Sequence, residues 1–246
     1  MPRSHRARRL TQAIAATVLF AVLTSCAGFE PRVLTPKDYP VHGIDVARYQ
    51  GDIDWKVAAR SGVAFAWIKA TEGGDHLDKK FYDNWYGAKE AGVPRGAYHF
   101  YYFCRTPEEQ AAWFIANVPY DPDALPMVLD MEWNNHSKTC TRIPKPDVVR
   151  KEMVTFLEIM EGYYGKRPVI YTDYNFHTDN LEGVFNGHHF WLRSIPRHPS
   201  ERFPGRRWTF WQYTAQGNVD GIKGHVDRNT FVGSWEDWKK FLKGDF

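Results

Sequence analysis

Two acidic residues stand two positions apart at the end of an apolar run. Residues 126–129 lead into Asp130, Met131 and Glu132. In a β-strand, residues two apart face the same side, so the two carboxyl groups should lie together while Leu129 and Met131 face the core. Two acids this close cannot both ionise freely, and one should keep its proton to a higher pH. A protonated acid beside an ionised one is what cleavage of a glycosidic bond requires, whereas an acidic surface strand is the simpler alternative.

Strands and helices alternate along the chain from about residue 41. Apolar and alternating segments predict strands at 42–47, 65–71, 95–103, 127–133, 168–174, 190–195, 208–213 and 225–231. Helical periodicity predicts helices at 55–61, 79–91, 107–117 and 147–164, with a weaker one at 177–185. No helix is expected in 196–207 or 214–224, so the last strands should pair as hairpins. The pattern predicts an α/β fold with one domain, a TIM-like barrel with an incomplete helical ring. An open doubly wound sheet is the alternative.

In such a barrel, functional residues lie at the carboxyl ends of the strands. Asp45 ends the first predicted strand, Asp130 and Glu132 end the fourth, and Asp227 lies in the eighth. The first and last strands are neighbours in a closed barrel, so Asp45 and Asp227 should meet. The aromatic residues at similar positions are Tyr98, Phe100, Trp133, Tyr171, Trp191, Trp211 and Tyr213. Acids surrounded by aromatic rings are typical of a carbohydrate-binding cleft.

The first 40 residues predict export and anchoring. Residues 1–25 carry four arginines and then a short apolar stretch, as in a signal peptide, and they end before Cys26. The sequence Leu23-Thr24-Ser25-Cys26 resembles the lipobox of bacterial lipoproteins, in which the cysteine receives the lipid. An ordinary secretory signal is the alternative. Residues 26–40 contain three prolines and predict a tether to a catalytic domain at 41–246.

A lipid at Cys26 would place the domain outside the cytoplasm, anchored to a bacterial membrane. Ala27 follows the cysteine, where an aspartate commonly retains lipoproteins in the inner membrane, so we expect the periplasmic face of the outer membrane. Removal of residues 1–25 takes away four arginines and no acid, and the formal net charge of +3 becomes −1. No basic stripe is left that would favour nucleic acid as a partner.

The remaining cysteines, Cys104 and Cys140, form an even pair in an oxidising compartment. Each follows a predicted strand, so we expect a disulfide between them, with two free buried thiols as the alternative. A divalent cation among the four acids is conceivable, since carboxylates suit Ca²⁺ and Mg²⁺. No ligand signature accompanies these acids, however, and we expect neither a metal nor a cofactor.

Seven short segments resemble the lysozymes of glycoside hydrolase family 25, in the order that this family has them. They are Gly43-Ile44-Asp45-Val46, Gln50-Gly51-Asp52-Ile53-Asp54-Trp55, Ile68-Lys69-Ala70-Thr71-Glu72-Gly73, Gly96-Ala97-Tyr98-His99-Phe100, Asp130-Met131-Glu132, Trp211-Gln212-Tyr213 and Val226-Asp227. The resemblance implies a (β/α)5β3 barrel. It also implies hydrolysis of the β-1,4 bond between N-acetylmuramic acid and N-acetylglucosamine in peptidoglycan.

The resemblance also implies roles for the acids. Glu132 would be the general acid, and Asp130 would orient the 2-acetamido group of the substrate as it attacks the anomeric carbon, with retention of configuration. Asp45 and Asp227 would bind substrate and tune Glu132. The side chains expected to bind the sugar are Tyr98, Phe100, Tyr171, Trp191 and Gln212. Arg193 and the basic tract 197–207 depart from the family pattern, which leaves the distal sugar and peptide subsites open.

Two other functions are weighed against this one. A family 18 chitinase-like enzyme would share the Asp-x-Glu pair and would cleave chitin oligomers. A lipoprotein that binds the cell wall without cleaving it belongs to a different class, but a pure binder gains nothing from a buried acid cluster. The sequence therefore predicts a membrane-anchored, monomeric muramidase that acts on the glycan strands of peptidoglycan.

Overall fold

The computed structural model describes residues 32–134, 137–195 and 197–246. One compact unit spans Val33–Phe246 and carries the whole barrel. The predicted signal segment and Cys26 lie outside the described residues. Tyr39 is buried and packs against the rings of His198, Trp208 and Trp211, so the folded unit begins before residue 41, earlier than the sequence suggested. Among the described residues, no helix has the length and apolar character needed to cross a membrane.

Eight strands close into a barrel, which confirms the predicted fold and excludes the open sheet. The strands are β1 (His42–Val46), β2 (Phe65–Glu72), β4 (Arg95–Phe100), β5 (Val128–Met131), β6 (Val169–Thr172), β7 (Phe190–Arg193), β8 (Phe210–Gly217) and β9 (Val226–Phe231). Each pairs with the next, and β9 pairs back to β1. The short strand β3 (His76–Leu77) is antiparallel to β2 and was not expected from the sequence.

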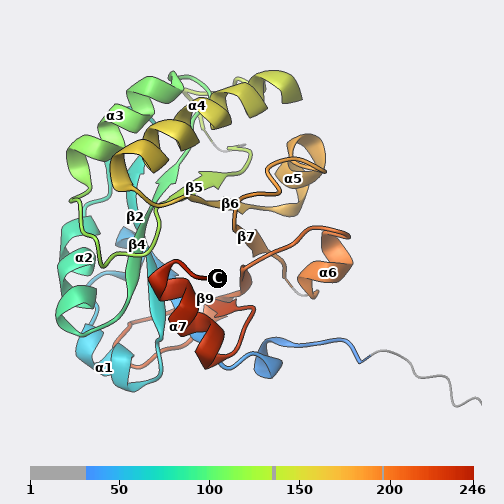
Figure 1. The fold of residues 1–246 in the computed structure, drawn as a ribbon. Helices are drawn as coiled ribbons and strands as arrows, with labels where there is room; N and C mark the ends of the chain where they lie inside the picture. The colour runs from blue at the N-terminus through green and yellow to red at the C-terminus, as the bar shows by residue number, and fades with distance from the viewer. Residues whose placement is uncertain (1–31, 135–136, 196) are drawn as a thin grey trace, which may run out of the picture. The chain divides into compact units, whose positions relative to one another are not determined.

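Four helices cover the outside of the first strands, and a short fifth follows β6, as Figure 1 shows. They are α1 (Trp55–Arg60), α2 (Phe81–Glu90), α3 (Pro107–Asn117), α4 (Pro146–Tyr164) and α5 (Tyr174–Asn180). Local signals fix their ends. The side chain of Asp54 accepts a hydrogen bond from Val57 N (3.0 Å) at the start of α1, and Gly165 ends α4 with φ of 69°. One-turn 3-10 helices lie at Pro36–Asp38 and Arg48–Gln50.

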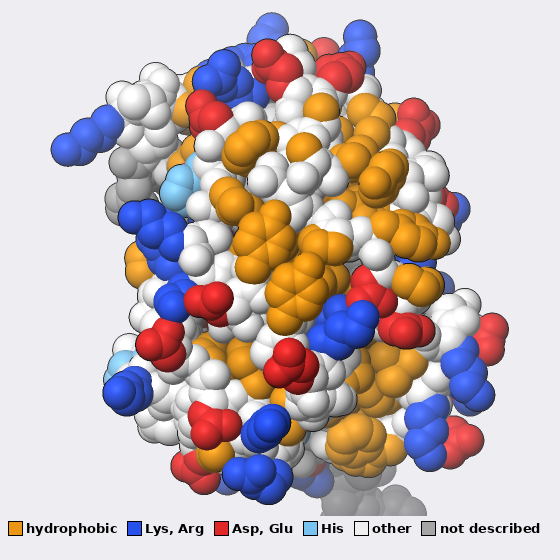
Figure 2. All heavy atoms as spheres, turned by 90° about the vertical axis from the view of Figure 1, so that its left-hand side faces the viewer, with side chains coloured by type: hydrophobic (Ala, Val, Ile, Leu, Met, Phe, Trp, Pro, Cys, Tyr) orange, Lys and Arg blue, Asp and Glu red, His pale blue; other side chains and the backbone are white. Residues whose placement is uncertain are grey.

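The face formed by α2 and its neighbours is turned to the viewer in Figure 2. Hydrophobic side chains gather there in a patch surrounded by charged ones. Two exposed residues of α2, Tyr82 and Tyr86, stack with their ring centroids 6.4 Å apart. The apolar sides of the helices face inward, where they form the core between the helices and the strands.

The last third of the chain differs from the expectation in three ways. The strands β7 and β8 pair in parallel rather than as a hairpin. Their connection contains the one-turn helix α6 (Pro199–Arg202), although no helix was expected in 196–207. Among the eight barrel strands of the described residues, only the pairs β8–β9 and β9–β1 are antiparallel. A further helix, α7 (Trp235–Lys243), was not expected and begins at a capping box formed by Ser234 and Asp237.

The helix α7 closes the amino end of the barrel. Its buried residues Trp238 and Phe241 contact Phe210 and Phe231, which start β8 and end β9. Inside the barrel, the ring of Trp67 packs directly against Gly96. A Cβ at position 96 would lie 2.2 Å from that ring, so a larger residue would clash there. Aromatic side chains thus pack the interior, and the strands can present a cleft only at their carboxyl ends.

Candidate active site

A cleft of about 500 Å³ opens at the carboxyl ends of the strands. All four predicted acids line it, and so do all five residues predicted to bind sugar. The lining side chains that the sequence had singled out are Asp45, Tyr98, Phe100, Asp130, Glu132, Trp133, Tyr171, Trp191, Gln212 and Asp227. Trp211 and Tyr213 do not line it: Trp211 packs against Tyr39, and the hydroxyl of Tyr213 lies 3.2 Å from Nδ1 of His42.

On one side of the cleft, β1 and β9 bring two acids together. Asp45 and Asp227 are direct partners in this antiparallel pair, as the closed barrel predicts. The Oδ2 atom of Asp45 accepts hydrogen bonds from Asn229 Nδ2 (2.8 Å) and from Gln212 Nε2 (3.0 Å). Burial and the charge of Asp227 nevertheless raise the pKa of Asp45 well above its usual value. Burial also raises the pKa of Asp227, while Arg193 opposes the rise.

Two buried aromatic residues hold these amide groups in place. The hydroxyl of Tyr171 donates to Gln212 Oε1 (3.0 Å), and Trp191 Nε1 donates to Asn229 Oδ1 (2.8 Å). Trp191 is only 2% exposed, so it supports the cleft floor from below and offers little ring surface to a ligand. Asn229 was not predicted from the sequence as a site residue. Its position two residues after Asp227 on a strand places both on one face, and that spacing was a usable signal.

On the other side of the cleft, Asp130 lies in β5 and is buried. Its Oδ1 atom has no hydrogen-bond partner in the part of the chain that the structure describes. Glu132 comes one residue after β5 ends at Met131, so the strand is shorter than the predicted 127–133. Burial raises the pKa of Asp130 well above its usual value, and the nearby charge of Glu132 adds to this rise.

Glu132 has the pKa of a proton donor near neutral pH. Burial raises its pKa to about 7, and the charge of Asp173 adds to the rise, whereas Arg193 and Lys69 oppose it. Asp173 also caps α5, because its Oδ1 accepts from Phe176 N (2.8 Å). A carboxyl group in this range can donate a proton to a leaving oxygen and take one back from water.

Two cations balance the acids in the cleft. Lys69, on β2, is buried and forms an ion pair with Glu72 (2.6 Å), and its ammonium lies 5.1 Å from the ring centroid of Phe100. Arg193 ends β7 and is exposed. Lys69 was not predicted from the sequence as a site residue, although a single lysine in an apolar strand indicates a buried, functional charge. Among the described residues, no group of histidines, cysteines and acids is arranged to hold a metal ion.

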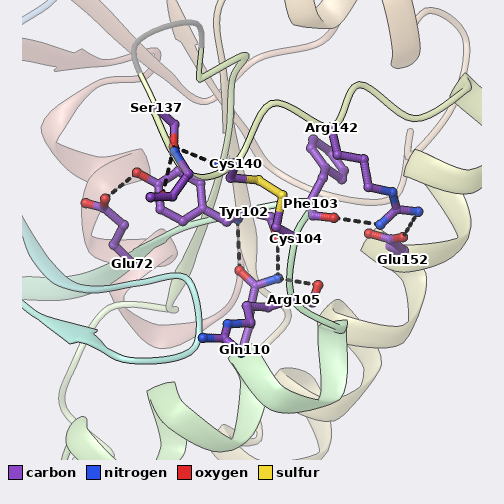
Figure 3. Close-up of a disulfide and its surroundings, with 11 residues drawn as sticks. Glu72, Tyr102, Phe103, Cys104, Arg105, Gln110, Ser137, Cys140, Arg142 and Glu152 are labelled. Carbon is purple, nitrogen blue, oxygen red and sulfur yellow. Dashed lines mark hydrogen bonds and ion pairs between the residues drawn. A yellow bond between two sulfur atoms is a disulfide. The ribbon is translucent and has the colours of Figure 1, made fainter.

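A disulfide joins Cys104 to Cys140 beside the cleft (Figure 3). It links the segment after β4 to the segment between β5 and α4. In Figure 3 the amide of Gln110 donates to the carbonyl of Tyr102 (2.8 Å), and Arg142 pairs with Glu152 (3.1 Å). A smaller cavity of about 150 Å³ lies here and shares Glu132, Trp133 and Asn134 with the cleft. The disulfide therefore braces the wall that carries Glu132.

Comparison with known proteins agrees with this geometry. Residues 44–222 match the model of glycosyl hydrolases family 25. The chain is 38% identical over 224 residues to lysozyme M1 of Streptomyces globisporus, which covers 85% of this chain and 74% of that protein. It is 37% identical over 217 residues to the uncharacterized protein YegX of Escherichia coli K12, which covers 85% of this chain and 76% of that protein.

Among solved structures, a family 25 glycosyl hydrolase from Bacillus anthracis superposes with a TM-score of 0.77. The identity is 36%, and the match covers 86% of this chain and 97% of that one. The family model spans most of the barrel, and its limits enclose three of the four acids and the whole Glu132 side of the cleft. The chain therefore belongs to glycosyl hydrolase family 25.

Proposed function

We propose that the protein is a muramidase that hydrolyses the β-1,4 bond between N-acetylmuramic acid and N-acetylglucosamine in peptidoglycan. The observation that carries this proposal is Glu132, a carboxyl group with a pKa of about 7 in the cleft of a family 25 fold. Glycosidic cleavage needs a proton for the leaving oxygen, and a side chain that holds one at neutral pH supplies it. The likeness to a protein named as a lysozyme supports the same substrate.

The proposed first step uses the substrate's own acetamido group. Glu132 gives its proton to the glycosidic oxygen as the bond to the anomeric carbon breaks. The acetamido carbonyl oxygen attacks that carbon from the opposite face and forms an oxazolinium ion, which keeps its N–H proton. Asp130 supports this step, because its unpartnered Oδ1 is free to accept the acetamido N–H and to stabilise the positive charge that develops there.

The second step returns the enzyme to its starting state. The Glu132 carboxylate removes a proton from water, and the resulting hydroxide equivalent opens the oxazolinium ion at the anomeric carbon, which restores the neutral acetamido group. Two inversions give net retention of configuration. Asp45 is held by two amide donors, and the charge of its strand partner Asp227 opposes ionisation of Glu132.

The proposal includes the cellular setting. We assign lipidation to Cys26, removal of residues 1–25, and action on the periplasmic face of the outer membrane as a monomer. The lipobox-like sequence supports the anchor. The Cys104–Cys140 disulfide supports an oxidising compartment, where such bonds persist. Labelling of expressing cells with a fatty-acid analogue should mark the wild-type chain and leave Cys26→Ala unmarked.

Digestion of purified sacculi by the full chain tests the reaction itself. Mass spectrometry should find fragments that end in reducing N-acetylmuramic acid, and Glu132→Gln should release none at comparable times. Fragments that end in reducing N-acetylglucosamine, or cleavage of chitin oligomers with intact sacculi, would point to the chitinase-like alternative. Binding to sacculi without any new reducing end would point to the wall-binding alternative. Proton NMR of the first product should show the β-anomer, since an α-anomer would exclude the acetamido route.

A further inference from the structure

A second groove, of about 350 Å³, is lined by Tyr174, Arg197, Glu201 and Arg202. It lies between the start of α5 and the β7–β8 connection that contains α6. Figure 1 shows these two short helices as neighbours. The proposed mechanism uses none of the four residues. Two guanidinium groups around one groove form a site for anionic groups, and the carboxylate beside them requires a separate explanation.

The groove lies next to the Glu132 side of the cleft. Tyr174 directly follows Asp173, whose charge acts on Glu132. The strands β6 and β7 pair in register with Thr172 opposite Leu192, so the next residues, Asp173 and Arg193, lie side by side at the carboxyl ends of these strands. Arg193 lines the cleft and precedes the groove residue Arg197 by four positions. A ligand bound in the cleft can therefore extend into the groove past these two residues.

The charged groups in the groove are available for a ligand. The guanidinium of Arg202 lies 4.7 Å from the ring centroid of Tyr174 and donates to the carbonyl of Ile195 (3.3 Å), which orients it. Within the described ranges, no ion pair or hydrogen bond engages the side-chain charges of Arg197 and Glu201. Ser194 Oγ donates to the carbonyl of Arg197 (2.6 Å) and leaves its guanidinium open, and the charge of Glu201 acts on the ring of His198 without forming an ion pair. Both side chains are exposed.

We infer that this groove binds the stem peptide that the muramic acid residue carries, an acidic peptide that also bears a free amino group. This inference rests on the proposed function, because the peptide reaches the groove only when its glycan lies in the cleft. Arg197 and Arg202 would bind its carboxylates, and Glu201 would bind the ammonium of its diamino acid. A polymer with phosphates alone matches the groove less well, since Glu201 would repel it.

The test compares peptide-bearing glycan strands with the same strands stripped of peptide by an amidase. The readout is kcat/KM on the peptide-bearing strands divided by kcat/KM on the stripped strands, measured with the full chain. We expect Arg197→Gln/Arg202→Gln to lower this ratio about tenfold, mainly through KM on the peptide-bearing strands. Arg207→Gln is the matched control, because Arg207 is exposed in the same tract and does not line the groove. It should leave the ratio unchanged.

Glu201→Gln tests the amino-group contact separately. It should reduce the preference for strands with a free diamino-acid ammonium over strands in which that amine is acetylated. An unchanged ratio in the double variant, or an equal loss on both substrates, would overturn the peptide site. A wild-type chain that cleaves neither substrate would instead overturn the proposed function, so the two failures are distinct. Soluble wall polyphosphate that competes in the wild type and not in the double variant would assign the groove to phosphate.

Discussion

The two acid pairs of the cleft are held in different ways. Asp45 receives two amide hydrogen bonds, whereas Asp130 keeps Oδ1 without a partner in the described chain. Burial raises the pKa of both carboxyl groups, so titration behaviour alone does not separate them. A buried carboxylate that two amide groups hold is a fixed part of the scaffold, but one with a buried oxygen that lacks a partner is costly until a ligand completes it.

This difference separates a supporting side from a reacting side. On the supporting side, Tyr171 and Trp191 donate hydrogen bonds to the side-chain amides of Gln212 and Asn229. These amides in turn donate to Asp45. On the reacting side, Glu132 leaves the sheet just after β5, and the disulfide braces the following segment. The distinction predicts which substitutions should stop the reaction and which should only weaken it.

Glu132→Gln gives the largest expected effect. The amide keeps the shape of the side chain but donates no proton to a leaving oxygen, so kcat should fall by roughly 10³-fold. Reducing-end release from sacculi measures it, with circular dichroism to verify the fold. Glu158→Gln, at an exposed position on α4, is the matched control and should keep full activity. Substantial turnover by Glu132→Gln would show that Glu132 is not the general acid.

Asp130→Asn and Asp45→Asn test the two sides directly. Asp130→Asn should lower kcat by about 10²-fold, since it removes the charge facing the developing oxazolinium ion. Asp45→Asn should cost about tenfold or less, because it changes the field and leaves the reacting groups in place. The Asp130 variant should also unfold at a higher temperature at pH 7, because a buried acid with a raised pKa destabilises the fold when ionised. Equal losses in kcat would erase the distinction.

Removal of the disulfide should lower the stability of the fold and, within the cleft, change the reacting side. Cys104→Ser/Cys140→Ser opens a loop with a sequence separation of 36 residues, and the free energy of unfolding should fall by about 3–4 kcal/mol. Urea unfolding measures this change. The KM for glycan should rise, because Trp133 and Asn134 line the cleft on the braced segment. An unchanged KM at a temperature where the variant is folded would show that the brace serves stability alone.

The pH dependence of kcat/KM should show the smallest effects, and their opposite directions make it a specific test. As pH rises through about 7, Glu132 loses its proton and kcat/KM should decline. Arg193→Gln removes a charge that lowers the pKa of Glu132, so the alkaline midpoint should move up. Asp173→Asn should move it down while still capping α5, each by less than about one pH unit. Shifts in the same direction would contradict the assigned electrostatics.

The free energy of unfolding should also depend on the protonation of Glu132, and it should fall as pH rises. The raised pKa of Glu132 means that between pH 4.5 and 7 the folded state binds more protons than the unfolded state. The stability from this protonated form is present below pH 4.5 and is lost as pH rises through 7. Glu132→Gln should therefore flatten the dependence of unfolding free energy on pH in this window.

Much of the fold was predictable because hydrophobic periodicity is a local property. The helix α3 has the predicted bounds 107–117, and all eight barrel strands overlap their predicted segments. The helix α7 was missed although its signals are local too: Ser234 and Asp237 form a capping box, and Trp238 and Phe241 stand three apart. The parallel pairing of β7 with β8 was not predictable, since it depends on which distant strands close the barrel.

The acids of the site were predictable from strand ends, but their partners were not. The proximity of Asp45 and Asp227 was predictable because closure of the barrel pairs its first strand, β1, with its last strand, β9. Gln212 and Asn229 come from two different strands, and only the register of β8, β9 and β1 brings their amides to one oxygen of Asp45. Asp173 looks like a helix cap in the sequence, and its effect on Glu132 arises only in three dimensions.

The burial of Tyr39 has a consequence for how the molecule can be presented to its substrate. Tyr39 packs into the fold just before the amino end of β1. Asp45, near the carboxyl end of the same short strand, lines the cleft. The segment around Tyr39 and the cleft thus lie at opposite ends of β1, whose five residues span about 17 Å, so a substrate in the cleft is held away from the point where the chain enters the barrel.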